Sequence, residues 1–130
     1  MAPEAVLHEY DGLRMVQRSM LGRCVLSFHG PITFKARRPF QDAIAKLRAE
    51  GCPSLALHLR EVPFVDSVAL ALITITWRTW SDGGFKVVIA EPSPYVKELL
   101  NLANITKLVS TFDSLQDAIA FLNGSDPPIS

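Results

Sequence analysis

The chain has 130 residues, of which 13 are Lys or Arg and 13 are Asp or Glu, and 48% are hydrophobic. This length suits a single globular domain, which can bury roughly two thirds of the surface that the unfolded chain exposes. The composition excludes a chain that is disordered throughout. The net charge of zero excludes a protein-wide basic field that would draw the protein onto nucleic acid or anionic lipid.

The apolar segments are too short for a membrane span. The longest nearly uncharged one, residues 67–77, falls well below the roughly 20 residues that a membrane-spanning helix needs. Residues 1–11 lack the basic start and the apolar run of a signal peptide. We therefore expect a cytoplasmic protein.

The two cysteines, Cys24 and Cys52, lie far apart in the sequence and form no Cys-x-x-Cys pair. No histidine lies near either of them at the spacing of a metal site. Cysteine commonly behaves as a small buried hydrophobe, so we expect two free buried thiols. We expect neither a metal nor another cofactor.

The first predicted elements are two strands and a helix. Residues 13–20 alternate between apolar and polar side chains, and residues 24–28 form a denser apolar run, which is typical of two strands joined by a tight turn. Residues 39–50 have the spacing of a helix with one apolar face. That face consists of Phe40, Ile44 and Leu47.

The second half of the chain alternates between buried strands and helices. Asp66 and Ser67 open a long apolar helix, in which Trp77 and Trp80 share one face and are expected to pack in the core. The predicted elements are a strand at 54–65, a helix at 68–80, a strand at 85–90, a helix at 95–103, a short strand at 108–112 and a helix at 115–122.

Strands that alternate with helices at these spacings form βα units, and such units build a largely parallel sheet. The pattern therefore predicts a single α/β domain at residues 13–123. Its sheet is expected to be mixed and mostly parallel, with an antiparallel hairpin at the edge and about four helices packed against it. Residues 1–12 are predicted to be an N-terminal extension, and residues 124–130 a flexible C-terminal tail.

The carboxyl ends of the strands are the expected place for a functional site, because ligands and partners of such sheets gather there. Three loops are predicted to emerge at this edge, namely residues 29–37, 66–69 and 91–95. The first loop carries a basic run, which consists of Lys35, Arg37 and Arg38. This run could meet an acidic surface of a partner.

Asp66 and Ser67 are the sharpest local feature. A turn from strand to helix places both side chains at a helix N-terminus, where free N–H groups and the positive end of the helix dipole favour an anion. In the structural interpretation, one of the two merely caps the helix, which stabilises it by about 1 kcal/mol. In the functional interpretation, Ser67 accepts a phosphate, whose nearly two negative charges repel a docked partner.

Two enzymatic interpretations fit poorly. The nucleophile elbow of a serine hydrolase wants glycine two residues before and two after its serine, where this chain has Val65 and Ala69. A receiver domain needs an acidic cluster after its first strand to hold Mg²⁺, and residues 29–33 contain no acid. We therefore expect no catalytic residue, and we expect a structural role for His58.

Five blocks of sequence carry a resemblance to a known family. The second block reads LHLREVPFVDS and the third reads GGFKVVIAEPSPYV. In order, the five blocks are residues 25–32, 57–67, 83–96, 102–108 and 112–119. Together they resemble the STAS domain, the family of bacterial anti-sigma factor antagonists that also supplies the cytoplasmic tails of sulfate transporters.

The resemblance implies a free-standing anti-sigma factor antagonist in which Ser67 matches the phosphorylated serine of the family. Its implied partners are an anti-sigma factor that is a GHKL-type serine kinase and a PP2C-type phosphatase, with no direct contact to nucleic acid. Homodimerisation is an open alternative. The expected partner-binding residues are Asp66, Val68, Ala69, Ala71, Leu72, Gly30, Ile32, Thr33 and Ser93.

The chain departs from the family pattern at three positions. Val68 and Ala69 stand where the family has serine and glycine, which stiffens the start of the helix and removes a polar contact. His58 stands where the family has aspartate, so the loop is less acidic than the family pattern implies. A second interpretation is therefore a STAS accessory subunit of a lipid-transport ABC ATPase, or a stressosome-type scaffold, that is not phosphorylated.

Overall fold

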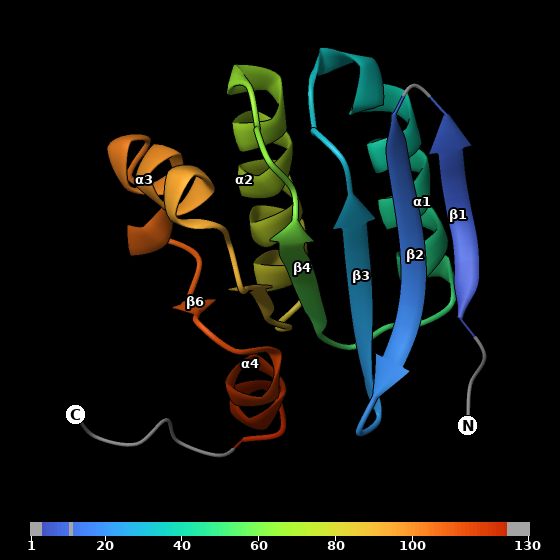
Figure 1. Cartoon of the computed structure of the whole chain (residues 1–130). Helices are drawn as coiled ribbons and strands as arrows, with labels where there is room; N and C mark the ends of the chain where they lie inside the picture. The colour runs from blue at the N-terminus through green and yellow to red at the C-terminus, as the bar shows by residue number, and fades with distance from the viewer. Residues whose placement is uncertain (1–3, 11, 125–130) are drawn as a thin grey trace.

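The computed structural model describes residues 4–10 and 12–124, which form a six-stranded sheet with packed helices (Figure 1). The strands cross the sheet in chain order. They are β1 (Ala5–Tyr10), β2 (Leu13–Met20), β3 (Arg23–His29), β4 (Leu55–Glu61), β5 (Val87–Ala90) and β6 (Thr111–Phe112).

The sheet is mixed, as the sequence predicts. β1, β2 and β3 pair antiparallel, whereas β3, β4, β5 and β6 pair parallel. Antiparallel neighbours can be joined by a tight turn, but each parallel pair needs a crossover connection, which the helices provide. The predicted α/β fold is therefore confirmed.

β1 is a strand that the sequence pattern did not predict. It lies inside the segment 1–12 that was assigned as an extension, and it forms the outer edge of the sheet beside the predicted hairpin of β2 and β3. An edge strand has only one neighbour and needs little apolar sequence, which explains its weak signal. Of the predicted tail 124–130, all but Gly124 lies outside the described residues.

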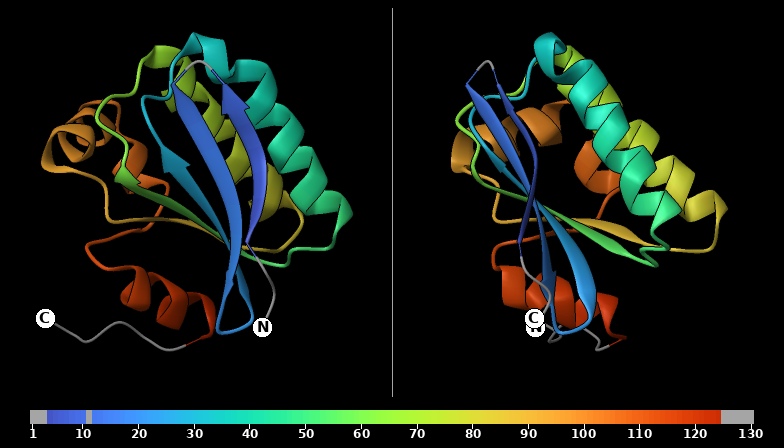
Figure 2. Two further views of the ribbon diagram at one scale, coloured as in Figure 1. Left: turned by 45° about the vertical axis from the view of Figure 1, so that its right-hand side comes forward. Right: turned by 90° about the vertical axis from the view of Figure 1, so that its right-hand side faces the viewer.

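Within the described ranges, four α-helices and two short 3₁₀ helices complete the fold, and α1 and α2 lie side by side on one face of the sheet (Figure 2). They are η1 (Phe34–Ala36), α1 (Arg37–Ala49), α2 (Ser67–Asp82), α3 (Pro94–Leu102), η2 (Ile105–Lys107) and α4 (Leu115–Leu122). None of the helices in the described part of the chain has the length and apolarity needed to cross a membrane.

The alternation of side chains along the strands divides the core into two layers. Leu57 of β4 packs in the larger cluster with residues of α1, α2 and α3, whereas its neighbour Ala56 packs in a smaller cluster with α4. Trp80 is buried in the larger cluster, and Trp77 packs against it while partly exposed, which confirms the predicted core role of this helix face.

The three parallel strands of the second half, β4, β5 and β6, are shorter than their predicted ranges. β4 ends at Glu61 rather than at residue 65, because Pro63 has no N–H to donate to a ladder. The last strand contains only Thr111 and Phe112, since the N–H groups of Leu108 and Val109 donate to the Ile105 carbonyl rather than to a neighbouring strand.

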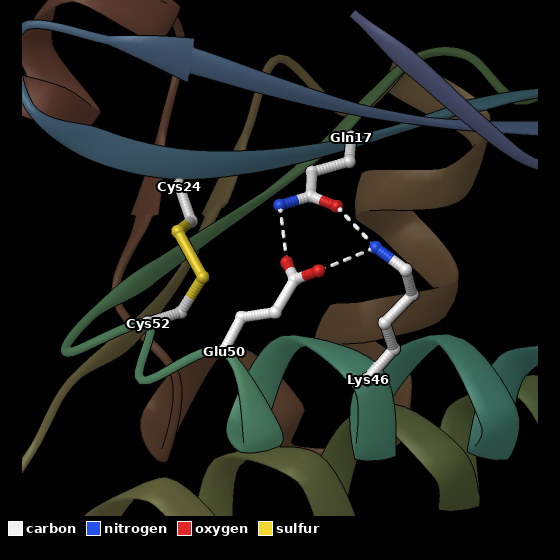
Figure 3. The surroundings of a disulfide bond; sticks show 5 residues. All are labelled: Gln17, Cys24, Lys46, Glu50 and Cys52. Carbon is white, nitrogen blue, oxygen red and sulfur yellow. Dashed lines mark hydrogen bonds and ion pairs between the residues drawn. A yellow bond between two sulfur atoms is a disulfide. The ribbon is translucent and has the colours of Figure 1, made fainter. Parts of the chain in front are cut away.

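The prediction of two free thiols was wrong, because Cys24 and Cys52 form a disulfide (Figure 3). Cys24 lies in β3, and Cys52 lies between α1 and β4. Parallel pairing of Cys24 with Leu55 brings the two cysteines together, with their Cα atoms 6.1 Å apart. The two cysteines are 28 residues apart in the sequence, and the register of the two strands brings them together. The spacing of the cysteines alone does not reveal that register.

Polar side chains beside the disulfide link the end of α1 to β2 (Figure 3). Lys46 Nζ lies 2.6 Å from Glu50 Oε2, and the Gln17 amide donates to the other carboxylate oxygen at 3.0 Å. These hydrogen bonds from Lys46 and Gln17 lower the pKa of Glu50 below its usual value. The cluster and the disulfide hold the same corner of the fold.

We expect the disulfide to stabilise the domain by about 2–4 kcal/mol, because it closes a loop of this length in the unfolded chain. Reduction with dithiothreitol, or replacement of both cysteines by serine, should lower the free energy of unfolding in urea by that amount. The double serine variant is the control and should not respond to reductant. Identical urea midpoints for the oxidised and reduced wild type would contradict the prediction.

Candidate functional site

The carboxylate of Asp66 joins the two loops at the carboxyl edge of the sheet. Asp66 is the N-cap of α2, and its Oδ1 accepts a hydrogen bond from the Ala69 N–H at 3.0 Å. Its Oδ2 accepts from the Phe34 N–H at 2.8 Å, at the start of η1. One side chain therefore caps α2 and also fixes the loop that follows β3.

Backbone hydrogen bonds continue this connection. The Ile32 N–H donates to the Phe64 carbonyl at 3.0 Å, and the Asp66 N–H donates to the Ile32 carbonyl at 3.2 Å. Gly30 enters the loop with φ +119°, and a Cβ there would collide with the Gly12 carbonyl oxygen. The position therefore requires glycine.

Ser67 is the first residue of α2, and its side chain is exposed. Its hydroxyl has no hydrogen-bond partner among the residues that the structure describes. Because Asp66 provides the cap, the Ser67 hydroxyl is not needed to cap α2. The Ser67 hydroxyl lies at a helix N-terminus, where the helix dipole favours a negative charge.

The predicted partner-binding residues do not all reach the surface. Ile32 and Ala69 are fully buried, and Leu72 is nearly so. The prediction that Ile32 and Ala69 contact a partner directly needs correction, because both side chains belong to the core beneath the site. Leu72 keeps a small exposed area and lines two of the surface cavities. The remaining predicted positions are exposed or half-buried, namely Gly30, Thr33, Asp66, Val68, Ala71 and Ser93.

Two of these residues, Thr33 and Ser93, also stabilise the start of a helix through their hydroxyl groups. The Thr33 hydroxyl accepts from the Lys35 N–H at 3.4 Å at the start of η1. Ser93 is the N-cap of α3, and its hydroxyl accepts from the Val96 N–H at 3.3 Å. Each loop at this edge is thus held by a short polar side chain, which leaves the surface between them pre-formed.

Three exposed aromatic residues at this edge were not predicted. Phe34 is 64% exposed and lines the same cavity as Ser67. Phe64 and Tyr95 stack with their ring centroids 6.3 Å apart, and both rings are substantially exposed. Large aromatic side chains are typical anchors of protein interfaces. Phe64 and Tyr95 each follow a proline in the sequence, which offered a signal, but the exposure of a ring depends on packing.

A model of the STAS domain family matches residues 13–118, which include the capped turn, the loop after β3 and all parallel strands. The chain belongs to the STAS domain family. None of the curated protein sequences compared with this STAS domain matches it.

Solved structures share the fold of this STAS domain. An anti-sigma factor antagonist from Mycobacterium paratuberculosis is 24% identical, with a TM-score of 0.75, over 85% of this chain and 94% of that one. The Bacillus cell fate determinant SpoIIAA in its phosphorylated form is 15% identical, with a TM-score of 0.62, over 84% and 97%. A sulfate transporter family protein from Wolinella succinogenes is 17% identical, with a TM-score of 0.67, over 76% and 83%.

His58 of the STAS domain lies in a hydrogen-bonded row with Ser27 and Glu91. Its Nδ1 lies 3.2 Å from the Ser27 hydroxyl, and its Nε2 lies 2.7 Å from Glu91 Oε1. The order of serine, histidine and carboxylate resembles a hydrolase triad, but Ser27 is only 1% exposed, so a substrate cannot reach its hydroxyl. The predicted structural role of His58 is confirmed.

Glu91 connects this row to α4. Its backbone has φ +55°, which is strained for a residue with a side chain, and its Oε2 accepts from the Leu115 N–H at 3.0 Å. Burial raises the pKa of Glu91, but the hydrogen bonds from His58 and from the Leu115 N–H more than offset this, so the pKa lies below 4.5. The carboxylate therefore stabilises the domain in its charged form.

We expect Asp66→Ala to destabilise the domain by about 1–3 kcal/mol, because it removes a helix cap and leaves the Phe34 N–H without its acceptor. Urea unfolding measures the loss, and hydrogen exchange should become faster at the Phe34 and Ala69 amides. Ser67→Ala is the matched control and should change stability by less than about 0.5 kcal/mol. Equal midpoints for the two variants would refute the bridging role of Asp66.

We expect the contribution of Glu91 to depend on pH in one direction. Because its pKa is lowered in the folded state, its stabilisation is present above pH 4.5 and is lost as the pH falls through the folded-state pKa. The difference in unfolding free energy between wild type and Glu91→Gln should therefore shrink between pH 7 and pH 3. Glu98→Gln, on the exposed side of α3, controls for the loss of one carboxylate. A constant difference across this range would argue against the interaction.

Proposed function

We propose that this STAS domain is an anti-sigma factor antagonist that binds a GHKL-type serine kinase and is released when the kinase phosphorylates Ser67. The observation that carries the proposal is the exposed Ser67 hydroxyl on the first turn of α2, which has no hydrogen-bond partner among the described residues and lies beside a cap that Asp66 already provides. A kinase can modify this hydroxyl without removing any contact that holds the fold.

The helix N-terminus makes this position suitable for a phosphate. The first N–H groups of a helix lack intrahelical partners, and the dipole favours negative charge there. A phosphorylated Ser67 is therefore compatible with an intact α2. The comparison with SpoIIAA, which has been solved in its phosphorylated and unphosphorylated forms, supports such a cycle in this fold.

The phosphate would act mainly on the partner. It adds nearly two negative charges next to Asp66, on an edge where exposed aromatic rings offer a docking surface. A partner that packs against these rings would have to bury or repel the new charge, and a charge mismatch across an interface costs several kcal/mol. A PP2C-type phosphatase would remove the phosphate and restore binding in the cytoplasm.

Two of the three departures from the family pattern, Val68 and Ala69, lie in the first turn of α2. Ala69 is fully buried and Val68 packs against the core while half-exposed, so both side chains are used in packing. They favour a rigid first turn, which would present Ser67 in one fixed geometry. The site would then act as a pre-formed surface rather than as a mobile loop.

We expect the cognate kinase with ATP to add one phosphate, at Ser67. Mass spectrometry should show a single phosphorylated species for the wild type and none for Ser67→Ala. Ser67→Asp should weaken kinase binding by about tenfold or more, measured by calorimetry. Ser81→Ala and Ser81→Asp are the matched controls, since Ser81 is exposed at the far end of α2.

Two outcomes would overturn the proposal. One is phosphorylation that persists in Ser67→Ala. The other is unchanged kinase affinity in Ser67→Asp, which would favour a constitutive subunit, such as a partner of an ABC ATPase. Pull-down of the native partner with the wild-type domain identifies the protein used in these measurements.

A further inference from the structure

A continuous groove runs along the outer side of α1 and α2, which lie next to each other on one face of the sheet (Figure 2). It consists of three cavities of about 420, 170 and 220 Å³. The first two share Gln41 and Ile75, and the last two share Arg48 and Thr79. We call this feature the helical groove. It begins at Ser67 and ends at Phe85.

The helical groove is mostly apolar and open to solvent. Phe40 and Leu72 lie buried at its floor, whereas Phe34, Ile75 and Phe85 are between 48% and 64% exposed along it. Exposed apolar surface of this extent on one face is typical of an interaction site.

The charged side chains that line the helical groove are all positive. Arg37 lines its first cavity and Arg48 lines the other two, and no carboxylate is among the residues that line the three cavities. Neither guanidinium forms a hydrogen bond or an ion pair with any residue that the structure describes. In a chain with equal numbers of acids and bases, this groove is locally cationic.

We propose that the helical groove binds an amphipathic helix of the partner, with apolar side chains in its cavities and acidic side chains toward Arg37 and Arg48. The proposal rests on the proposed function, because it takes this partner to be the kinase that modifies Ser67. Both walls of the groove are helices, whose backbone groups are already paired, so no free strand edge is available for an extended peptide.

The spacing of the two arginines sets the pattern of the partner helix. They are 11 residues apart in α1, which corresponds to about 16 Å along a helix axis. A partner helix that runs along the groove should therefore carry two acidic residues about three turns apart. Its apolar residues should recur every third or fourth position between them.

The groove also connects to the phosphorylation site. Ser67 and Arg37 line the same cavity, so a phosphate on Ser67 would compete with the partner's carboxylate for this guanidinium. Phosphorylation would then weaken binding in the groove as well as at the edge of the sheet.

The test compares charge reversal in the helical groove with charge reversal elsewhere. Arg37→Glu combined with Arg48→Glu should weaken kinase binding at least tenfold, and Ile75→Asp should weaken it similarly. Lys107→Glu, at an exposed position in η2, is the matched control and should bind as the wild type does. Thermal unfolding checks that every variant is folded.

A peptide tests the groove independently of the kinase. The probe is a 16-residue helix with leucines at helical spacing and two glutamates 11 residues apart, and its counterpart has lysines in place of the glutamates. NMR titration should shift the amides of Ile75 and Thr79 with the glutamate peptide only, and the Arg37→Glu, Arg48→Glu variant should lose this response.

The outcomes separate this inference from the proposed function. If Ser67→Asp weakens kinase binding but the groove variants do not, and the glutamate peptide shifts no groove amide, the groove inference is wrong and the proposed function stands. If the peptide binds in the groove but Ser67 is not phosphorylated, the inference stands without the kinase. A concentration-dependent dimer that Ile75→Asp abolishes would overturn it in favour of a second copy of the chain.

Discussion

The site depends on the two oxygens of the Asp66 carboxylate. One oxygen caps α2 through Ala69 and the other accepts from the Phe34 N–H, so the strand-to-helix turn and the loop after β3 are fixed relative to each other. Asparagine has a single acceptor oxygen and could satisfy only one of these donors. Because Asp66 takes the capping role, the Ser67 hydroxyl stays exposed, and Phe34 is held beside it as an outward-facing ring.

Local patterns in the sequence predicted most of the fold, because alternation and helical spacing are properties of neighbouring residues. They also located the turn at Asp66 and Ser67, but only the backbone geometry shows which of the two is the cap. The disulfide between Cys24 and Cys52 depends on the register of β3 and β4, and the helical groove depends on how α1 packs against α2. Long-range features of this kind leave no periodic signal in the chain.

The stabilising interactions outside the core lie away from the proposed docking surface. The disulfide joins the amino-terminal ends of β3 and β4, opposite the edge that carries Ser67. In a reducing compartment such a bond is commonly open, and the cap at Asp66 does not depend on it. The row of Ser27, His58 and Glu91 lies on the α4 face of the sheet and ties that helix to β3 and β4. A strained backbone at Glu91 is offset there by the hydrogen bonds of its carboxylate.

The equal numbers of acidic and basic residues make single local charges important for partner recognition. With equal numbers of acids and bases, the chain has no overall field, so recognition depends on where single charges lie. Asp66 is engaged by two N–H groups, whereas Arg37 and Ser67 face the same cavity without partners among the described residues. A phosphate at this point would change the sign of the charge at the mouth of a cationic groove. The same modification would thus act on the edge of the sheet and on the groove, although it is made on a single hydroxyl that the fold itself does not use.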